Sequence, residues 1–148
     1  MAGDQAREVM EQRSGRRQSV LSGPSTHDGI EALASRVNGF LAALGMPGKT
    51  AFHIEFALHE ALTNAAFHGN GGDPTKAVTV TCRAEPHEVT LIIDNEGAGF
   101  DPGCVPDCRA EVNLLSESGR GVFLMYQFAD ECRYEKGGRR VVLVKRWP

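Results

Sequence analysis

Residues 60–70 read EALTNAAFHGN and close a longer run of apolar residues at helical spacing. On a helix, Glu60, Asn64 and His68 follow one another every four residues, so they form one polar ridge beside the apolar stripe. A carboxylate and an amide one turn apart suit a magnesium–nucleotide site, because Mg²⁺ prefers oxygen ligands and a carboxylate can accept a proton from an attacking hydroxyl. The spacing predicts a helix over residues 49–68 whose ridge lines a pocket at the edge of the core.

Periodicity on both sides of this helix predicts an α+β fold. An earlier helix begins at Ser25 or Thr26 and ends near Leu44, with apolar residues at helical spacing. Grouped helices followed by hairpins indicate a two-layer α/β sandwich, in which the helices cover one face of a mixed sheet. Alternation and turn signals predict strands over residues 18–22, 78–83, 89–93, 131–135 and 140–145, a short helix over residues 122–128, and a hairpin turn at Gly137-Gly138.

Length and composition are those of one globular domain. The chain has 148 residues, of which 41% are hydrophobic and 24% are charged, as in ordinary domains of this size. We expect a disordered tail over residues 1–17 and a single domain over residues 18–148. Lys and Arg number 16 against 19 for Asp and Glu, a net charge of −3, so nucleic acid is not expected as a direct partner.

The sequence does not indicate a membrane protein or a structural zinc site. No apolar run approaches the ~20 residues of a membrane span, and the polar N-terminal residues lack the apolar centre of a signal peptide. We therefore expect a cytoplasmic protein without a membrane partner. The four cysteines form no C-x-x-C pair, so free thiols are expected rather than a zinc ribbon.

Basic residues gather on the last two predicted strands. The plain interpretation is a solvated strand face with charges that protect a sheet edge. The alternative is a docking surface for an acidic partner. The residues are Arg133, Lys136, Arg139, Arg140, Lys145 and Arg146.

Three motifs occur in a fixed order along the chain. They are E-x-x-x-N-x-x-x-H-G-N at residues 60–70, D-N-E-G-x-G-F at residues 94–100 and G-x-G-V-x-L-M at residues 119–125. Together they resemble the ATP-binding fold of DNA gyrase, sensor histidine kinases, the MutL repair protein and the large heat-shock chaperone. Within that superfamily the chain is most similar to the anti-sigma factor serine/threonine kinases, and the resemblance covers about residues 19–146.

The resemblance implies a site for ATP and Mg²⁺. In such a site Glu60 is the general base that activates the substrate serine, and Asn64 is the magnesium ligand. His68 lies by the nucleotide or packs at the helix end, and residues 103–118 form a lid over the phosphates. The further residues that the resemblance places at the nucleotide are Gly69 and Asn70, Gly97, Gly99 and Phe100 around the adenine, and Gly119, Arg120, Gly121 and Val122 on the phosphates.

One position departs from the family pattern. The family places an aspartate two residues before the first glycine of G-x-G, where it accepts a hydrogen bond from the adenine amine, and this chain has Asn95 there. Strand alternation puts Asn95 on the inner face with Val89 and Leu91, and Asp94 on the outer face, although a bulge could instead bring Asp94 inward. An asparagine carbonyl accepts the same bond without the charge, so we expect weaker ATP binding.

The implied function is that of an ATP-dependent serine/threonine protein kinase that also acts as an anti-sigma factor. Such a protein holds a sigma factor inactive and phosphorylates a serine on a small anti-anti-sigma (STAS-type) protein. The unphosphorylated form of that antagonist releases the sigma factor. Family members pair as homodimers, and we expect the same of this chain.

Two other interpretations use the same residues. A non-catalytic or weakly nucleotide-binding module would act only by sequestering a partner, and Asn95 is the reason to consider it. A histidine kinase catalytic domain is suggested by HEALTN at residues 59–64, which resembles a phosphoacceptor box. No second copy of that box and no dimerising helical hairpin accompany it, so we disfavour the histidine kinase.

Overall fold

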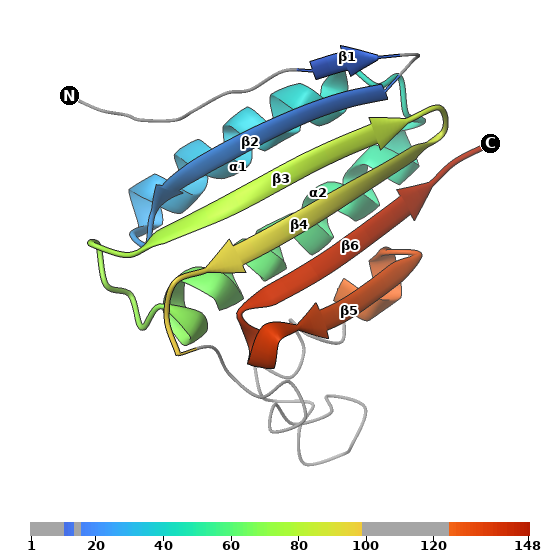
Figure 1. The fold of residues 1–148 in the computed structure, drawn as a ribbon. Helices are drawn as coiled ribbons and strands as arrows, with labels where there is room; N and C mark the ends of the chain where they lie inside the picture. Colours follow the sequence, from blue (N-terminus) through green and yellow to red (C-terminus); the bar gives the residue numbers. More distant parts are fainter. Residues whose placement is uncertain (1–10, 14–15, 99–124) are drawn as a thin grey trace.

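Six strands and two long helices form two layers in the computed structural model of this chain (Figure 1). The structure describes residues 11–13, 16–98 and 125–148. The strand order in the sheet is β1-β2-β3-β4-β6-β5. The strands are β1 (Glu11–Arg13), β2 (Arg16–Pro24), β3 (Ala77–Glu85), β4 (Glu88–Asn95), β5 (Glu131–Glu135) and β6 (Arg140–Arg146), with a short 3-10 helix, η4 (Lys136–Gly138), between the last two.

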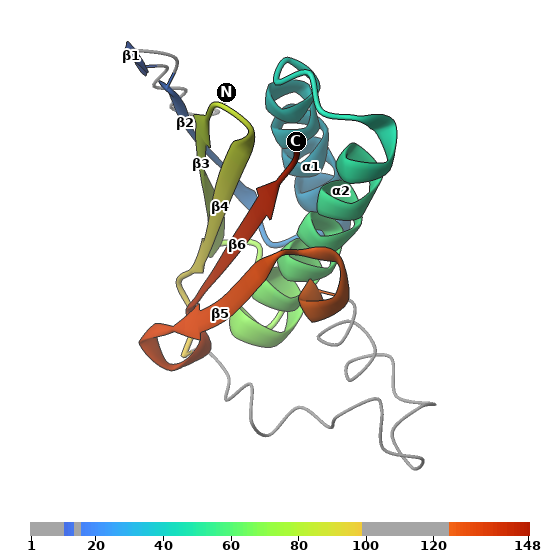
Figure 2. The ribbon, with the colours of Figure 1, turned by 90° about the vertical axis from the view of Figure 1, so that its right-hand side faces the viewer.

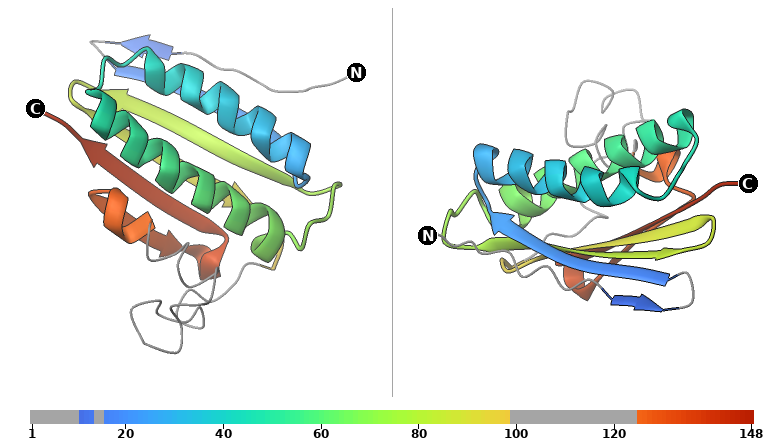
Figure 3. Two further views of the ribbon diagram at one scale, coloured as in Figure 1. Left: turned by 180° about the vertical axis from the view of Figure 1, so that it is seen from behind. Right: turned by 90° about the horizontal axis from the view of Figure 1, so that it is seen from above.

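Both long helices lie on the same face of the sheet, as the side and top views show (Figure 2, Figure 3). Helix α1 (His27–Ala42) begins after Thr26, whose hydroxyl accepts a hydrogen bond from the Gly29 amide at 3.0 Å, an ordinary N-cap. Helix α2 (Gly48–Thr63) continues directly into a π-helix, η1 (Asn64–Gly69). The prediction of an α+β sandwich with helices on one face is confirmed.

Every strand pair in the described residues is antiparallel, which corrects the expectation of a mixed sheet. The reason lies in the connection between β2 and β3. Pro24 at the end of β2 pairs with Ala77 at the start of β3, and α1 and α2 run in opposite directions between them (Figure 3). Two antiparallel helices return the chain to the end of the sheet at which β2 finished, so β3 runs antiparallel to β2. A parallel pair would need a connection that crosses to the opposite end of the strands.

The apolar core lies between the helices and the inner face of the sheet. The stripe predicted on α2 is buried there, with Leu58 and Leu62 exposed by only 1% and 0%. Alternate residues of β4 meet it from the other side, and Leu91 and Ile93 are exposed by 0% and 1%. The helical period of 3.6 residues and the strand period of 2 residues therefore predicted the buried faces of α2 and β4 correctly.

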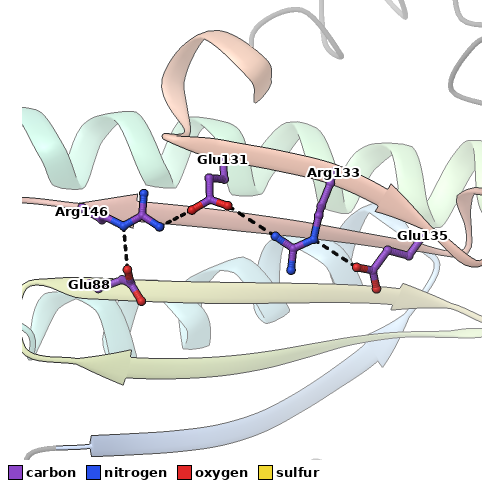
Figure 4. A network of polar contacts seen from close by, with 5 residues as sticks. All are labelled: Glu88, Glu131, Arg133, Glu135 and Arg146. Carbon is purple, nitrogen blue, oxygen red and sulfur yellow. Dashed lines mark hydrogen bonds and ion pairs between the residues drawn. The ribbon is translucent and has the colours of Figure 1, made fainter.

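The outer face of the sheet carries a chain of ion pairs across β4, β6 and β5 (Figure 4). Arg146 pairs with Glu88 at 2.7 Å and also with Glu131, and Arg133 pairs with Glu131 at 3.6 Å and with Glu135 at 3.2 Å. Exposed pairs of this kind add little stability, but they neutralise Arg133 and Arg146, two of the basic residues of the last strands. The arrangement favours the solvated strand face over a docking surface for an acidic partner.

Strand structure at the N-terminal end begins earlier in the chain than the sequence analysis predicted. Strand β1 and the start of β2 lie inside the segment expected as a tail, because Glu11–Arg13 pairs with Arg16–Gln18, while residues 1–10 lie outside the described residues. The assignment of residues 18–148 to one domain stays a prediction. The short helix expected over residues 122–128 is described over residues 125–128. Of the helices that the structure describes, none is long and apolar enough to cross a membrane.

Replacing Leu58 with alanine should lower the free energy of unfolding by ~2–5 kcal/mol, because it leaves a cavity between α2 and the sheet. Phe52→Ala is the control on the same helix: Phe52 is 59% exposed, and we expect a loss below about 1 kcal/mol. Urea denaturation followed by circular dichroism measures both variants. Equal losses would contradict the assignment of the buried face of α2.

Candidate functional site

The helix that carries the predicted polar ridge changes its winding at Asn64. Helix α2 is regular up to Thr63, and the π-helix then begins, with the Asn70 amide donating to the carbonyl of Ala65, five residues back, at 2.9 Å. A π-turn contains more residues than an α-turn, so the side chains beyond Asn64 are rotated relative to a continuous α-helix. Single π-turns inside helices occur frequently at functional sites.

The three polar residues of the ridge differ in burial. Asn64 is 6% exposed, Glu60 is half-buried and His68 is exposed. Glu60 and Asn64 are one α-turn apart, whereas His68 lies within the π-helix that begins at Asn64. Within the described part of the chain, Glu60 has no hydrogen-bond or ion-pair partner, so no described residue engages its carboxylate.

The two polar residues at the end of β4 point to opposite faces of the sheet. Asp94 accepts two hydrogen bonds from the guanidinium of Arg140, its partner in β6, at 2.7 and 3.2 Å. Asn95 lies on the inner face with the buried residues of the strand. Pairing with β3 is unbroken along the strand. The predicted alternation is thus confirmed, and no bulge brings Asp94 inward.

Asn95 ties the turn after β4 to the connection between β5 and β6. Its Oδ1 accepts a hydrogen bond from the Gly97 amide at 3.1 Å, and its Nδ2 donates to the Gly138 carbonyl at 3.3 Å. Its main-chain amide donates to the carbonyl of Arg139 at 2.9 Å. An amide oxygen can accept two hydrogen bonds, and among the described residues Oδ1 accepts one, from Gly97.

Two glycines bring the end of η1 against the turn after β4. A Cβ on Gly97 would overlap the carbonyl oxygen of Gly69, and a Cβ on Gly69 would overlap the side-chain amide of Asn95. Only glycine can occupy both positions at this distance. Gly97, which the resemblance places at the adenine, therefore also has a packing role: it lets the backbone that follows Asn64 touch the backbone that follows Asn95.

Asn70, a buried asparagine, links three segments beside the Gly69–Gly97 contact, a role that the sequence analysis did not predict. Asn70 is 3% exposed, and its Nδ2 donates to Ser25 Oγ at 2.9 Å and to the Ala77 carbonyl at 3.0 Å. Its Oδ1 accepts from the Glu96 amide at 2.8 Å. The Asn70 side chain thus joins the start of α1, the start of β3 and the end of β4. Both of its polar atoms are used by the fold.

A tyrosine from β5 reaches the end of α2, which the sequence analysis did not single out. The hydroxyl of Tyr134 donates toward Sδ of Met125 at 4.0 Å and is in polar contact with the side chain of Asn64. Burial raises the pKa of Tyr134 well above the ordinary value for tyrosine. Alternation along β5 predicts that Tyr134 points inward. It does not predict the contact with Asn64, because the two residues are far apart in the sequence.

The residues present fit a magnesium–nucleotide site. Asn64 offers an amide oxygen on a nearly buried side chain, and its Nδ2 lacks a hydrogen-bond partner of regular geometry. The described residues contain no group of three or more His, Cys, Asp or Glu side chains placed to hold a metal ion, but Mg²⁺ bound with a nucleotide needs only one or two protein oxygens beside phosphates and water. The expected contacts that lie outside the described residues are Gly99, Phe100, Gly119, Arg120, Gly121 and Val122, with the lid over residues 103–118.

Gly97→Ala should lower the free energy of unfolding by more than about 2 kcal/mol, because its methyl group collides with the Gly69 carbonyl. Gly39→Ala is the control: the new Cβ meets no atom within 4 Å on the exposed side of α1, so stability should rise by about 0.5–1 kcal/mol. Thermal and urea unfolding measure both. A Gly97→Ala protein as stable as the parent would contradict the close contact.

Comparisons with known proteins identify the family of this chain. The family model of the histidine kinase-like ATPase domain matches residues 23–145. An anti-sigma F factor of Anoxybacillus flavithermus is 33% identical over 116 residues, which cover 74% of this chain and 78% of that protein. An anti-sigma F factor of Clostridium novyi is 28% identical, with coverage of 74% and 80%. The serine-protein kinase RsbW of Bacillus licheniformis is 26% identical, with coverage of 78% and 76%. The chain therefore belongs to the histidine kinase-like ATPase domain family, within the group of anti-sigma factors and serine-protein kinases of the RsbW type.

Proposed function

We propose that this protein is an ATP-dependent serine/threonine protein kinase that acts as an anti-sigma factor in a partner-switching circuit. Its substrate is a serine on a small anti-anti-sigma protein of the STAS type, and its other partner is a sigma factor. The observation that carries the proposal is the pair formed by Glu60, which no described residue engages, and nearly buried Asn64, one turn apart beside the Gly69–Gly97 contact. A homodimeric assembly is part of the proposal through the resemblance.

Glu60 is assigned the role of general base. Its carboxylate takes the proton of the substrate serine hydroxyl as that oxygen attacks phosphorus. ATP with Mg²⁺, when bound, supplies the phosphoryl group and neutralises the charge that develops during transfer. The half-buried position of Glu60 on a rigid helix holds the base in place while leaving it open to a protein substrate.

Asn64 is assigned to the magnesium ion through Oδ1. The side chain is nearly buried, so its rotamer is restrained and little order is lost when the ion binds. The Gly69–Gly97 contact keeps Gly69, at the end of the π-helix that begins with Asn64, against Asn95. We assign the second lone pair of Asn95 Oδ1 to the adenine amine.

A second candidate function is sequestration of a partner by a weakly nucleotide-binding or non-catalytic protein of the same fold. Asn95 favours it, because a neutral amide accepts a weaker hydrogen bond than a carboxylate. The amide is also engaged with Gly97 and Gly138. Calorimetric titration with ATP and ADP, with and without Mg²⁺, separates the two candidates. Saturable magnesium-sensitive binding supports the kinase, and no binding at millimolar nucleotide supports sequestration alone.

Glu60→Gln should keep the ATP affinity of the parent and lose at least about 100-fold in phosphoryl transfer, because glutamine cannot accept the serine proton. Transfer is measured with radiolabelled ATP and a purified STAS-type anti-anti-sigma protein. Glu55→Gln is the control, since Glu55 is half-buried on the same helix but is not assigned to the site. Transfer by Glu60→Gln at the parental rate would remove Glu60 as the base.

Asn95→Asp should raise the affinity for ATP about fivefold, because hydrogen bonds to charged acceptors are stronger by ~1 kcal/mol. The same change should reduce thermal stability, since a carboxylate would face the Gly138 carbonyl instead of donating to it. Asp94→Asn is the control on the outer face, where Asp94 contacts Arg140, and it should leave ATP affinity unchanged. A larger effect from Asp94→Asn than from Asn95→Asp would reverse the assignment.

A further inference from the structure

The side chain of Tyr134 connects two parts of the candidate site. Tyr134 lies on β5 opposite Val141 of β6, on the inner face of the sheet. Its hydroxyl reaches Sδ of Met125 at 4.0 Å and the side chain of Asn64. Met125 is itself fully buried. A side chain from the edge strand is therefore wedged between the end of α2 and the helix at residues 125–128.

The amide of Asn64 raises a question of orientation. The residue is 6% exposed, and Nδ2 is buried with no regular hydrogen bond to any described residue. Burying an amide donor without an acceptor is unfavourable. A half-turn of the amide exchanges its oxygen and nitrogen at almost no steric cost. Whatever holds Nδ2 therefore decides which atom of Asn64 is presented to a ligand.

The Tyr134 hydroxyl has the chemistry to hold Nδ2. Its single hydrogen is directed toward the sulfur of Met125, and the oxygen of a hydroxyl can accept a hydrogen bond as well as donate one. A tyrosine hydroxyl is protonated at neutral pH, so it can donate to Met125 and accept from Nδ2 together. With Nδ2 held by Tyr134, the amide oxygen of Asn64 is left for a metal ion. The NH₂ group of an amide could not take that place, because it only donates hydrogen bonds.

We propose that Tyr134 is a positioning residue for Asn64: its hydroxyl oxygen accepts a hydrogen bond from Nδ2 and presents Oδ1 to the magnesium ion of the bound nucleotide. The inference rests on the proposed nucleotide site and adds to it a residue from a distant strand. It requires a small approach of the Asn64 amide to the hydroxyl, which turns their present polar contact into a regular hydrogen bond.

The test is the magnesium dependence of ATP affinity, measured by calorimetry with Mg²⁺ and with EDTA. Tyr134→Phe keeps the ring and removes the oxygen. It should reduce the ratio of the two affinities about tenfold, the effect of losing a group that orients a metal ligand, and leave affinity in EDTA unchanged. Tyr126→Phe is the matched control, because Tyr126 is 51% exposed and should change neither affinity.

A double variant isolates the path of the effect. In an Asn64→Ala background, Tyr134→Phe should have no further effect on the ratio, because Tyr134 acts only through Asn64. An equal fall of both affinities in Tyr134→Phe would mark a packing role and overturn the proposal. An additional fall in the double variant would also overturn it.

The controls keep this inference separate from the proposed function. A parent protein without magnesium-sensitive ATP binding would overturn both together. Normal magnesium sensitivity in the parent, its loss in Asn64→Ala and its retention in Tyr134→Phe would overturn the Tyr134 role alone. If Tyr134→Phe fails to fold, hydrogen exchange of the Asn64 side-chain amide in the parent decides. Protected amide protons support the bond to Tyr134, and exchange at the rate of a free amide overturns it.

Discussion

The contact between the Gly69 carbonyl and Gly97 is the constraint on which the candidate site depends. Because neither position can carry a Cβ, the end of η1 and the turn after β4 meet backbone against backbone. That contact sets the end of η1, which begins at Asn64, against Asn95 and Gly97. Asn70 then links three segments beside this contact with three hydrogen bonds. Catalysis by positioning of the reacting groups requires a rigid arrangement of this kind, because small displacements of the groups that hold a phosphoryl donor greatly reduce the reaction rate.

The polar residues divide between structure and site by the environment of their atoms. Both polar side-chain atoms of Asn70 form hydrogen bonds within the fold. Asp94 forms an ion pair with Arg140 on the outer face of the sheet. Glu60 is uncommitted among the described residues, and Asn64 has a buried nitrogen that lacks a regular partner. Unsatisfied buried groups are rare in proteins and call for an explanation. The proposed site, completed by a ligand and by Tyr134, supplies that explanation.

The chain's departure from the family at Asn95 has a structural side. An aspartate at this position could accept from the Gly97 amide but could not donate to the Gly138 carbonyl. The asparagine thus exchanges a charged acceptor at the proposed adenine position for a bond that links β4 to the β5–β6 connection. Whether the protein works as a kinase or by sequestration depends on how much ATP affinity this exchange leaves. The fold accommodates both candidates.

Local pattern was sufficient for much of this protein. The periods of 3.6 and 2 predicted both long helices, the four longer strands and β5, and the inward direction of Asn95, because side-chain direction follows directly from backbone geometry. The order of the three motifs carried the family. The all-antiparallel pairing, the π-helix that begins at Asn64, the hydrogen bonds of Asn70 and the approach of Tyr134 to Asn64 came only from the tertiary structure. Each depends on contacts between segments far apart in the chain, and a local pattern cannot encode which distant atom satisfies a buried polar group.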